Sequence, residues 1–363
     1  VDDAVRAAID LGVSSSLNCP EEVELAELLC TLHPWAEMVR YARSGGEAMT
    51  VAVRIARAHT GRDKVAFCGY HGWHDWYLAA NVGTEDALGE HLISGLDPRG
   101  VPKALAGTAL PFRYNQIDEL KAIVTLNRKH LAAIVMEPIR NDPPNDGYFD
   151  EIRSIADECG AVLIIDEISS GFRMNTGGAH LKMNIRPDIA VFSKAMGNGY
   201  AIAAIIGKSE VMESAQSTFI SSTNWTERIG PVAAIATITK HQRLNVGDHL
   251  MRIGAAIQQG WTKASTEHGV PIHVGGIPPL SHFSFETAEP LSVKALFVQL
   301  MLDRGFLAST SFYSMLAHTD QQVQAYLKAV NEVFSEISEL EKTGRVAEHL
   351  IGKPATAGFK RLN

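Results

Sequence analysis

The first part of the chain alternates short apolar runs with longer amphipathic segments. Six runs have the length and composition of buried strands: Glu37–Ala42, Lys64–Cys68, Ala132–Met136, Val162–Asp166, Ile189–Ser193 and Ile202–Ile206. The segments between them repeat apolar residues with helical spacing, as in Glu151–Cys159, which ends before Gly160. This alternation predicts an α/β fold in which helices cover both faces of a large, mostly parallel sheet.

The two ends of the chain have a different pattern of predicted helices and strands. Residues 1–35 are expected to be helical, with Pro20 opening a helix. The elements expected after residue 245 are helices at Gly247–Ala264, Val293–Arg304 and Asp320–Thr343, with short strands near His273 and at His282–Glu286. We predict a helical segment at 1–35 that belongs to a small domain or an interface, a large cofactor-binding domain at 36–245, and a small α+β domain at 246–363. The chain does not begin with Met, so we expect it to start partway into a longer protein.

Composition narrows the class of protein. The 363 residues are 46% hydrophobic and 20% charged, which is ordinary for a globular enzyme. A net charge of -8 argues against a broad surface for nucleic acid or anionic membranes. No apolar run reaches the roughly 18 residues of a membrane span. The four cysteines lack CxxC spacing, which predicts reduced thiols in a cytoplasmic protein.

Two strand ends carry the most informative side chains. Asp166 ends one predicted strand, and Lys194 follows another. Ligands of open α/β sheets bind at the carboxyl ends of the strands. There a lysine can form an imine with an aldehyde cofactor while the acid pairs with a pyridinium nitrogen, as in pyridoxal 5'-phosphate (PLP) chemistry. A surface ion pair is the alternative, but the apolar runs before both residues favour a cleft.

A glycine-rich segment, Ser44–Ala48, lies between a predicted strand and a helix expected over Glu47–Thr60. Glycines allow backbone N–H groups to approach a phosphate, and a helix N-terminus favours anions. The segment is not a P-loop, because no Gly-Lys-Ser/Thr follows it. An ordinary turn is the alternative interpretation.

An aromatic segment, Gly69–Trp76, follows the strand that ends at Cys68. An aromatic ring at this position could stack on a planar cofactor, or it could simply pack the loop onto the sheet. The two histidines His71 and His74, with Asp75 nearby, also suggest a metal site, but the third ligand is not evident, and we predict no metal.

Several motifs occur in the order of a known family. They are Ser44–Ala48, Gly69–Gly72, Glu137-Pro138, Asp166–Arg173, Pro187-Asp188, Ser193-Lys194 and Ala317–Thr319. From about residue 20 to 340 the chain resembles the class III PLP-dependent aminotransferases, and most closely their glutamate-1-semialdehyde aminomutase branch. The resemblance implies the fold of the type I PLP-dependent transferases, in which a large sheet domain carries a smaller α+β domain.

The resemblance also implies residue roles. Lys194 matches the lysine that forms the imine with PLP, and Asp166 matches the acid on the pyridinium nitrogen. The other implied contacts are Ser44, Gly45 and Gly46 at the phosphate, Tyr70 on the ring with His71 beside it, Glu137 on the substrate side, and Thr226 at the phosphate of a neighbouring subunit. A homodimer with shared active sites follows from the last of these.

The implied activity is amino transfer between an amine or amino acid and a carbonyl compound through a Lys194 Schiff base. A 2,1-aminomutase is the runner-up. A PLP decarboxylase or racemase, a non-catalytic PLP-fold protein and a nucleotide-binding enzyme are further alternatives. Trp73, His74 and Trp76 replace the small residues that the family carries after Tyr-His-Gly, and residues 139–144 and 225–231 also depart from its pattern. These departures surround the substrate pocket, so the substrate stays open.

Overall fold

A computed structural model describes residues 1–84, 86–91, 93–139 and 141–354. The chain divides into two compact units. The first comprises Val1–Ile139 and Pro144–Asn245, and the second is built mainly from Val246 onward. Residues 1–35 belong to the first unit. The three-part domain division predicted from the sequence stays a prediction.

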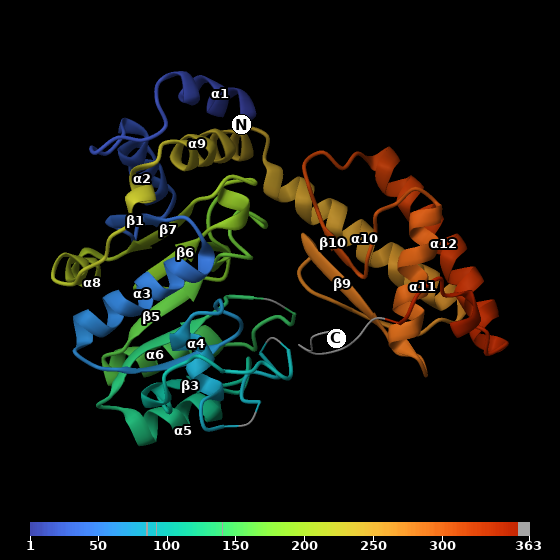
Figure 1. Ribbon diagram of the computed structural model, residues 1–363, viewed down its shortest axis with the longest axis horizontal. Coiled ribbons are helices and arrows are strands. Elements are labelled where there is room, and N and C mark those ends of the chain that lie inside the picture. The colour runs from blue at the N-terminus through green and yellow to red at the C-terminus, as the bar shows by residue number, and fades with distance from the viewer. Residues whose placement is uncertain (85, 92, 140, 355–363) are drawn as a thin grey trace. The chain divides into compact units, whose positions relative to one another are not determined.

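The first unit is built on a seven-stranded sheet with the strand order β1-β7-β6-β5-β4-β2-β3 (Figure 1). Its strands are β1 (Met38–Ala42), β2 (Lys64–Cys68), β3 (Ala109–Pro111), β4 (Leu131–Met136), β5 (Val162–Asp166), β6 (Ile189–Phe192) and β7 (Ala203–Gly207). The five strands from β3 to β6 in this order run parallel, whereas β7 is antiparallel to both β6 and β1. This confirms the predicted mostly parallel sheet. Strand β3 was not predicted, because three residues ending in proline give almost no periodic signal.

Helices cover both faces of this sheet. The helices of this unit are α1 (Asp2–Asp10), which packs on α9, and α2 (Pro20–Leu32), α3 (Gly45–Thr60), α4 (Asp75–Leu78), α5 (Ile117–Asn127), α6 (Tyr148–Cys159), α7 (Ala179–Lys182), α8 (Ser209–Met212) and α9 (Ile229–Arg243). Alternate residues of β4 face opposite layers: Val135 packs in the cluster with α3, and Ile134 in the cluster with α6. Every residue of β4 is therefore buried, as expected for a strand covered on both sides.

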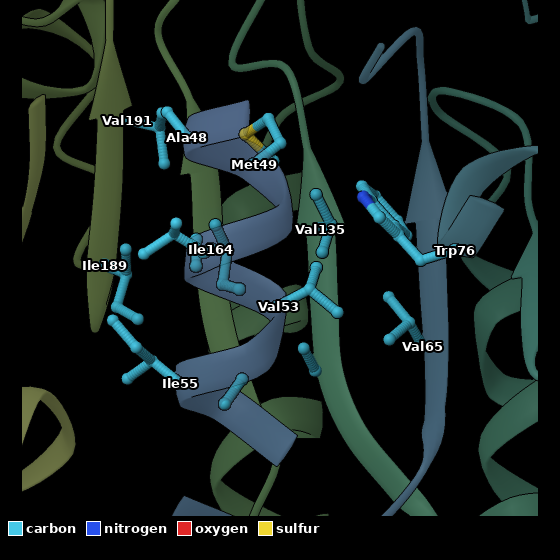
Figure 2. Packing of buried hydrophobic residues seen from close by; sticks show 14 of the residues in the cluster. Ala48, Met49, Val53, Ile55, Val65, Trp76, Val135, Ile164, Ile189 and Val191 are labelled. Atoms are coloured by element: carbon cyan, nitrogen blue, oxygen red, sulfur yellow. The ribbon is translucent and has the colours of Figure 1, made fainter. Parts of the chain in front are cut away.

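Helix α3 is the central element of one layer. Its buried side chains Met49, Val53 and Ile55 belong to one cluster with Ile164 of β5 and Ile189 of β6 (Figure 2). This packing anchors the helix across the sheet. Its N-terminus is thereby set near the strand ends that carry the predicted chemistry.

The start of α3 differs from the prediction. We expected the helix to begin at Glu47, after a turn at Gly45 and Gly46, but it begins at Gly45 with Ser44 as the N-cap. The two glycines are thus the first two helical residues. Low helix propensity does not stop a helix at these positions, because the first N–H groups need no intrahelical partner.

The second unit is a small α+β layer structure. Helices α10 (Val246–His268), α11 (Pro290–Asp303) and α12 (Asp320–Lys342) pack with strands β8 (Ile272–Gly275), β9 (Leu280–Phe285) and β10 (Ser311–Tyr313). The sheet is antiparallel, and its core contains Trp261, Phe283, Phe297 and Phe334. Thr319 and Gln322 form a capping box that starts α12. Among the residues described, no helix has the length and apolar character needed to cross a membrane.

Candidate active site

The carboxyl ends of β2 and β5 bring a histidine and an acid together. His71 lies in the loop after β2, and Asp166 is the last residue of β5. His71 Nδ1 is 2.8 Å from Asp166 Oδ2, and both side chains are almost fully buried. The sequence predicted both residues as site residues, and the structure shows that they form one pair.

Hydrogen-bond geometry indicates how protons are distributed in this pair. His71 Nε2 lies 3.0 Å from the carbonyl oxygen of Cys68, which can only accept, so Nε2 carries a proton. The Nδ1–Oδ2 contact then contains a second proton, and the pair is neutral overall. Asp166 Oδ1 accepts the backbone N–H of Ile168 at 2.9 Å. Each carboxylate oxygen can accept more than one bond, so Asp166 can still receive a further donor.

Lys194 lies at the same edge of the sheet. It follows β6, and its Nζ donates to Ser169 Oγ at 2.7 Å, in the loop directly after Asp166. The side chain is exposed. The backbone of Lys194 has φ = 41°, a left-handed conformation that costs a non-glycine residue about 1–2 kcal/mol. Such local strain gathers at functional sites, where the surrounding structure enforces it.

The start of α3 meets the loops after β2 and β5. A Cβ built on Gly45 would lie 2.9 Å from Ile168 Cδ1, and one built on Gly72 would lie 2.9 Å from Gly46 Cα. Gly72 has φ = 98°, so both its conformation and its close approach require glycine. The three loops therefore converge at one place.

This helix start has the donors that a phosphate needs. Ser44 makes no capping hydrogen bond, and its carbonyl accepts the N–H of Ala48. Helix geometry leaves the N–H groups of Gly45, Gly46 and Glu47 without intrahelical acceptors. Since the helix dipole adds positive potential there, the turn fits the phosphate of PLP.

Glu137 and Tyr70 are also held close together. Glu137, which follows β4, is buried, and its Oε2 accepts the backbone N–H of Tyr70 at 3.2 Å. A Cβ on Gly69 would come within 2.5 Å of the same oxygen, and Gly69 has φ = 108°. The half-buried Tyr70 ring packs edge-on against Tyr77, with 5.8 Å between ring centroids. Glu137 thus holds the backbone from which the Tyr70 ring projects.

The structure places Thr226 elsewhere. Its Oγ1 donates to the carbonyl oxygen of Ser15 at 3.1 Å. The neighbouring Trp225 is the residue that reaches α3 within this chain, because its Nε1 donates to Glu47 Oε1 at 3.1 Å. The predicted contact of Thr226 with a phosphate belongs to a neighbouring subunit and stays a prediction.

The two histidines of the aromatic segment have separate partners. His71 bonds to Asp166, whereas His74 Nδ1 lies 2.6 Å from Thr50 Oγ1 on α3. Within the described ranges, no three His, Cys, Asp or Glu side chains are grouped so as to hold a metal ion.

A buried network behind the site was missed by sequence reasoning. Glu167 is fully buried, and its Oε1 accepts both the backbone N–H and Nδ1 of His180, each at 2.7 Å. Its Oε2 accepts Ser170 Oγ at 2.6 Å. Burial alone would raise the pKa of Glu167, but the bonds from His180 and Ser170 bring it below its ordinary value. The available signal was the acid pair itself, because consecutive strand-end side chains point to opposite faces.

Comparison with known proteins identifies the family. The profile of the Aminotransferase class-III family matches residues 1–334. The chain belongs to this family. The chain is 34% identical over 353 residues to a 3-aminobutyryl-CoA aminotransferase of Cloacimonas acidaminovorans (strain Evry), covering 94% of this chain and 81% of the relative. It is 30% identical over 330 residues to a 2'-deamino-2'-hydroxyneamine transaminase of Streptomyces kanamyceticus, covering 89% and 79%.

Solved structures share the fold. The FumI protein of Sphingopyxis sp. MTA144, in its PLP internal aldimine form, superimposes with a TM-score of 0.83 at 23% identity, covering 94% of this chain and 81% of the other. An omega-transaminase from Sphaerobacter thermophilus gives a TM-score of 0.82 at 24% identity, covering 93% and 83%. At this identity the likeness supports the predicted fold and nothing finer.

Proposed function

We propose that this class III aminotransferase moves an amino group between an amine or amino acid and a carbonyl compound, with Lys194 as its reactive amine. The observation that carries the proposal is the convergence of Lys194, Ser169, Asp166 and His71 at one sheet edge, beside the start of α3. When bound, PLP supplies an aldehyde that captures amino groups and a ring that withdraws electrons from the attached carbon.

Lys194 has two tasks in this proposal. Its Nζ would hold the cofactor covalently until a substrate amine takes its place. The amine of Lys194 would then accept a proton from the carbon that bears the substrate nitrogen and return it to the cofactor carbon. Ser169 Oγ, 2.7 Å away, holds Nζ at the edge of the sheet between these events.

The other residues would hold and orient the cofactor. Asp166 would accept a hydrogen bond from the protonated ring nitrogen, and His71 supports the negative charge of Asp166. Tyr70 would stack on the ring. Ser44, Gly45 and Gly46 would hold the phosphate through the uncapped start of α3. Glu137 would act on the substrate side of the cofactor.

The reaction type and the substrates are finer parts of the proposal. A 2,1-aminomutase, as in the glutamate-1-semialdehyde branch, would use the same residues but return nitrogen to the same molecule. The substrates named for the two relatives suggest that 3-aminobutyryl-CoA and amino sugars should join α-amino acids in a donor panel. Mass spectrometry of the product then separates transfer to a second molecule from migration within one.

We further propose a homodimer in which Thr226 reaches the phosphate of the partner's site. One two-fold contact would complete both sites at once. Mixing Lys194→Ala chains with Thr226→Val chains tests this, because the one lysine-bearing site in the heterodimer then has an intact threonine from the other chain. Heterodimers without restored activity would contradict the role of Thr226.

A cytoplasmic location is also proposed, supported by four free cysteines.

The decisive experiment replaces the lysine. Lys194→Ala should abolish turnover and the yellow absorbance that disappears on adding an amine donor. Borohydride reduction followed by peptide mapping should place the pyridoxyl label on Lys194 in the parent. Lys240→Ala, an exposed lysine on α9, serves as the control and should keep both properties. A label on another lysine in the Lys194→Ala protein would remove Lys194 from the role.

A further inference from the structure

We propose that His74 donates a charged hydrogen bond to the phosphate of PLP at the start of α3. The inference rests on the proposed function, because it requires the cofactor phosphate at Gly45 and Gly46. The imidazole lies directly against this turn: a Cβ built on Gly46 would be 3.4 Å from His74 Nε2 and 3.5 Å from Cδ2. The edge of the ring that carries Nε2 therefore adjoins the backbone donors of the turn.

The orientation of the ring follows from the hydrogen bonds on its other nitrogen. Thr50 has one hydroxyl proton, and it donates this proton to the carbonyl oxygen of Gly46 at 2.9 Å. Thr50 Oγ1 must then accept from His74 Nδ1, 2.6 Å away. Nδ1 is the protonated nitrogen, and Nε2 is left to face the turn. Among the described residues, no hydrogen-bond partner lies on Nε2.

A phosphate at this turn would bring a proton to Nε2. PLP carries about two negative charges on its phosphate, as other phosphate monoesters do near neutral pH. Since Nδ1 already donates to Thr50, a bond from Nε2 makes the ring an imidazolium. The groups that the structure shows against the ring are uncharged: they are Thr50, Gly46 and the Trp73 ring, which stands edge-on with 4.7 Å between centroids.

The arginine that precedes the turn makes its hydrogen bonds elsewhere. Arg43 precedes the turn, but its guanidinium donates to the carbonyl oxygens of Asn224, Trp225 and Glu227 at 2.6–2.9 Å. Glu47, the acid of the first turn, accepts the backbone N–H of Arg43 at 2.8 Å and the Trp225 indole at 3.1 Å. His74 is thus well placed to add positive charge to the neutral backbone donors of the turn.

The test compares PLP with pyridoxal, which has the same aldehyde and ring but no phosphate. In the full chain, His74→Phe should weaken PLP binding by about tenfold or more, as expected for a lost charged hydrogen bond. Pyridoxal binding should change less than twofold. His74→Gln keeps a neutral donor, so its affinity for PLP should lie between those of the parent and His74→Phe. His59→Phe, at the opposite end of α3, is the matched control and should bind both like the parent.

A direct readout is the nitrogen shift of His74 in protein labelled with 15N-histidine. Adding PLP should move the 15N chemical shift of Nε2 from the range of an unprotonated imidazole nitrogen to that of a protonated one. Adding pyridoxal should leave this chemical shift unchanged. An unchanged Nε2 with PLP bound, or equal losses for PLP and pyridoxal in His74→Phe, would overturn the role of His74. Failure of the parent to bind PLP would instead contradict the proposed function.

Discussion

Two consecutive acids, Asp166 and Glu167, each bond to the Nδ1 of a buried histidine, at 2.8 Å and 2.7 Å. Asp166 faces the sheet edge with Lys194, whereas Glu167 faces the core beneath it. The difference lies in the second nitrogen of each histidine. His71 Nε2 meets a carbonyl oxygen and must donate, but His180 Nε2 accepts the indole N–H of Trp35 at 3.0 Å.

The same two residue types therefore hold different numbers of protons. The Asp166–His71 pair is neutral, because its histidine donates at Nε2 and a further proton lies between the partners. The Glu167–His180 pair carries one negative charge, since His180 has a proton only on Nδ1. Asp166, the acid proposed to pair with the cofactor ring, has a partner that offsets its charge. The carboxylate of Glu167, the structural acid, instead accepts three hydrogen bonds from two residues, His180 and Ser170.

The largest expected effect is at Asp166, the acid proposed to pair with the cofactor ring. Asp166→Asn should bind PLP and keep its melting temperature within a few degrees, but turnover should fall by about 10³-fold, because the ring nitrogen loses its charged partner. Single-turnover kinetics with a donor amine measure this loss. Turnover within tenfold of the parent would mean that the ring nitrogen pairs with another residue.

The structural acid should show the opposite behaviour. Glu167→Ala leaves the His180 and Ser170 donors buried without an acceptor and should lower the free energy of unfolding by about 3 kcal/mol. Turnover per folded molecule should change only a few-fold. Glu167→Gln is the milder control. Its amide oxygen can accept the bonds that Oε1 accepts, and the Ser170 hydroxyl can rotate to accept a hydrogen bond from its amide N–H. Urea unfolding measures the stabilities. Equal losses for Ala and Gln would show that the buried bonds contribute little.

A smaller effect concerns pH. His33 stacks on His180, with 5.4 Å between centroids, and burial lowers the pKa of His33 from 6.5 to about 4. Between pH 6.5 and about pH 4 the unfolded chain binds a proton at His33, but the folded chain does not. The stability that is present above pH 6.5 is therefore lost as the pH falls toward 4. Between about pH 7.5 and about pH 5 this amounts to about 2 kcal/mol.

His33→Gln should remove this component. The difference in unfolding free energy between parent and variant should shrink by that amount on going to the lower pH. Parallel stability curves for the two proteins would contradict the assignment. Turnover measured at pH 7.5 serves as the control and should be similar in both.

Much of the fold was predictable because it depends on local pattern. The bounds of β2 and β5 were predicted as observed, since each is a continuous apolar run between polar segments. Asp166 and Lys194 could be placed at one edge, because parallel strands end together. The start of α3 and the short strand β10 were missed, as glycine propensity and three-residue strands leave weak signals.

The chain by itself therefore determined the sheet, the order of its motifs and the family, because hydrophobic periodicity and motif order are properties of neighbouring residues. Only the tertiary structure decided which nitrogen of each histidine carries a proton. Cys68, three residues before His71, is a local partner. The other acceptors and donors come from separate segments: Asp166 for His71, Trp35 and Glu167 for His180, and Thr50 for His74. No local pattern encodes these pairings, since each requires separate elements to meet.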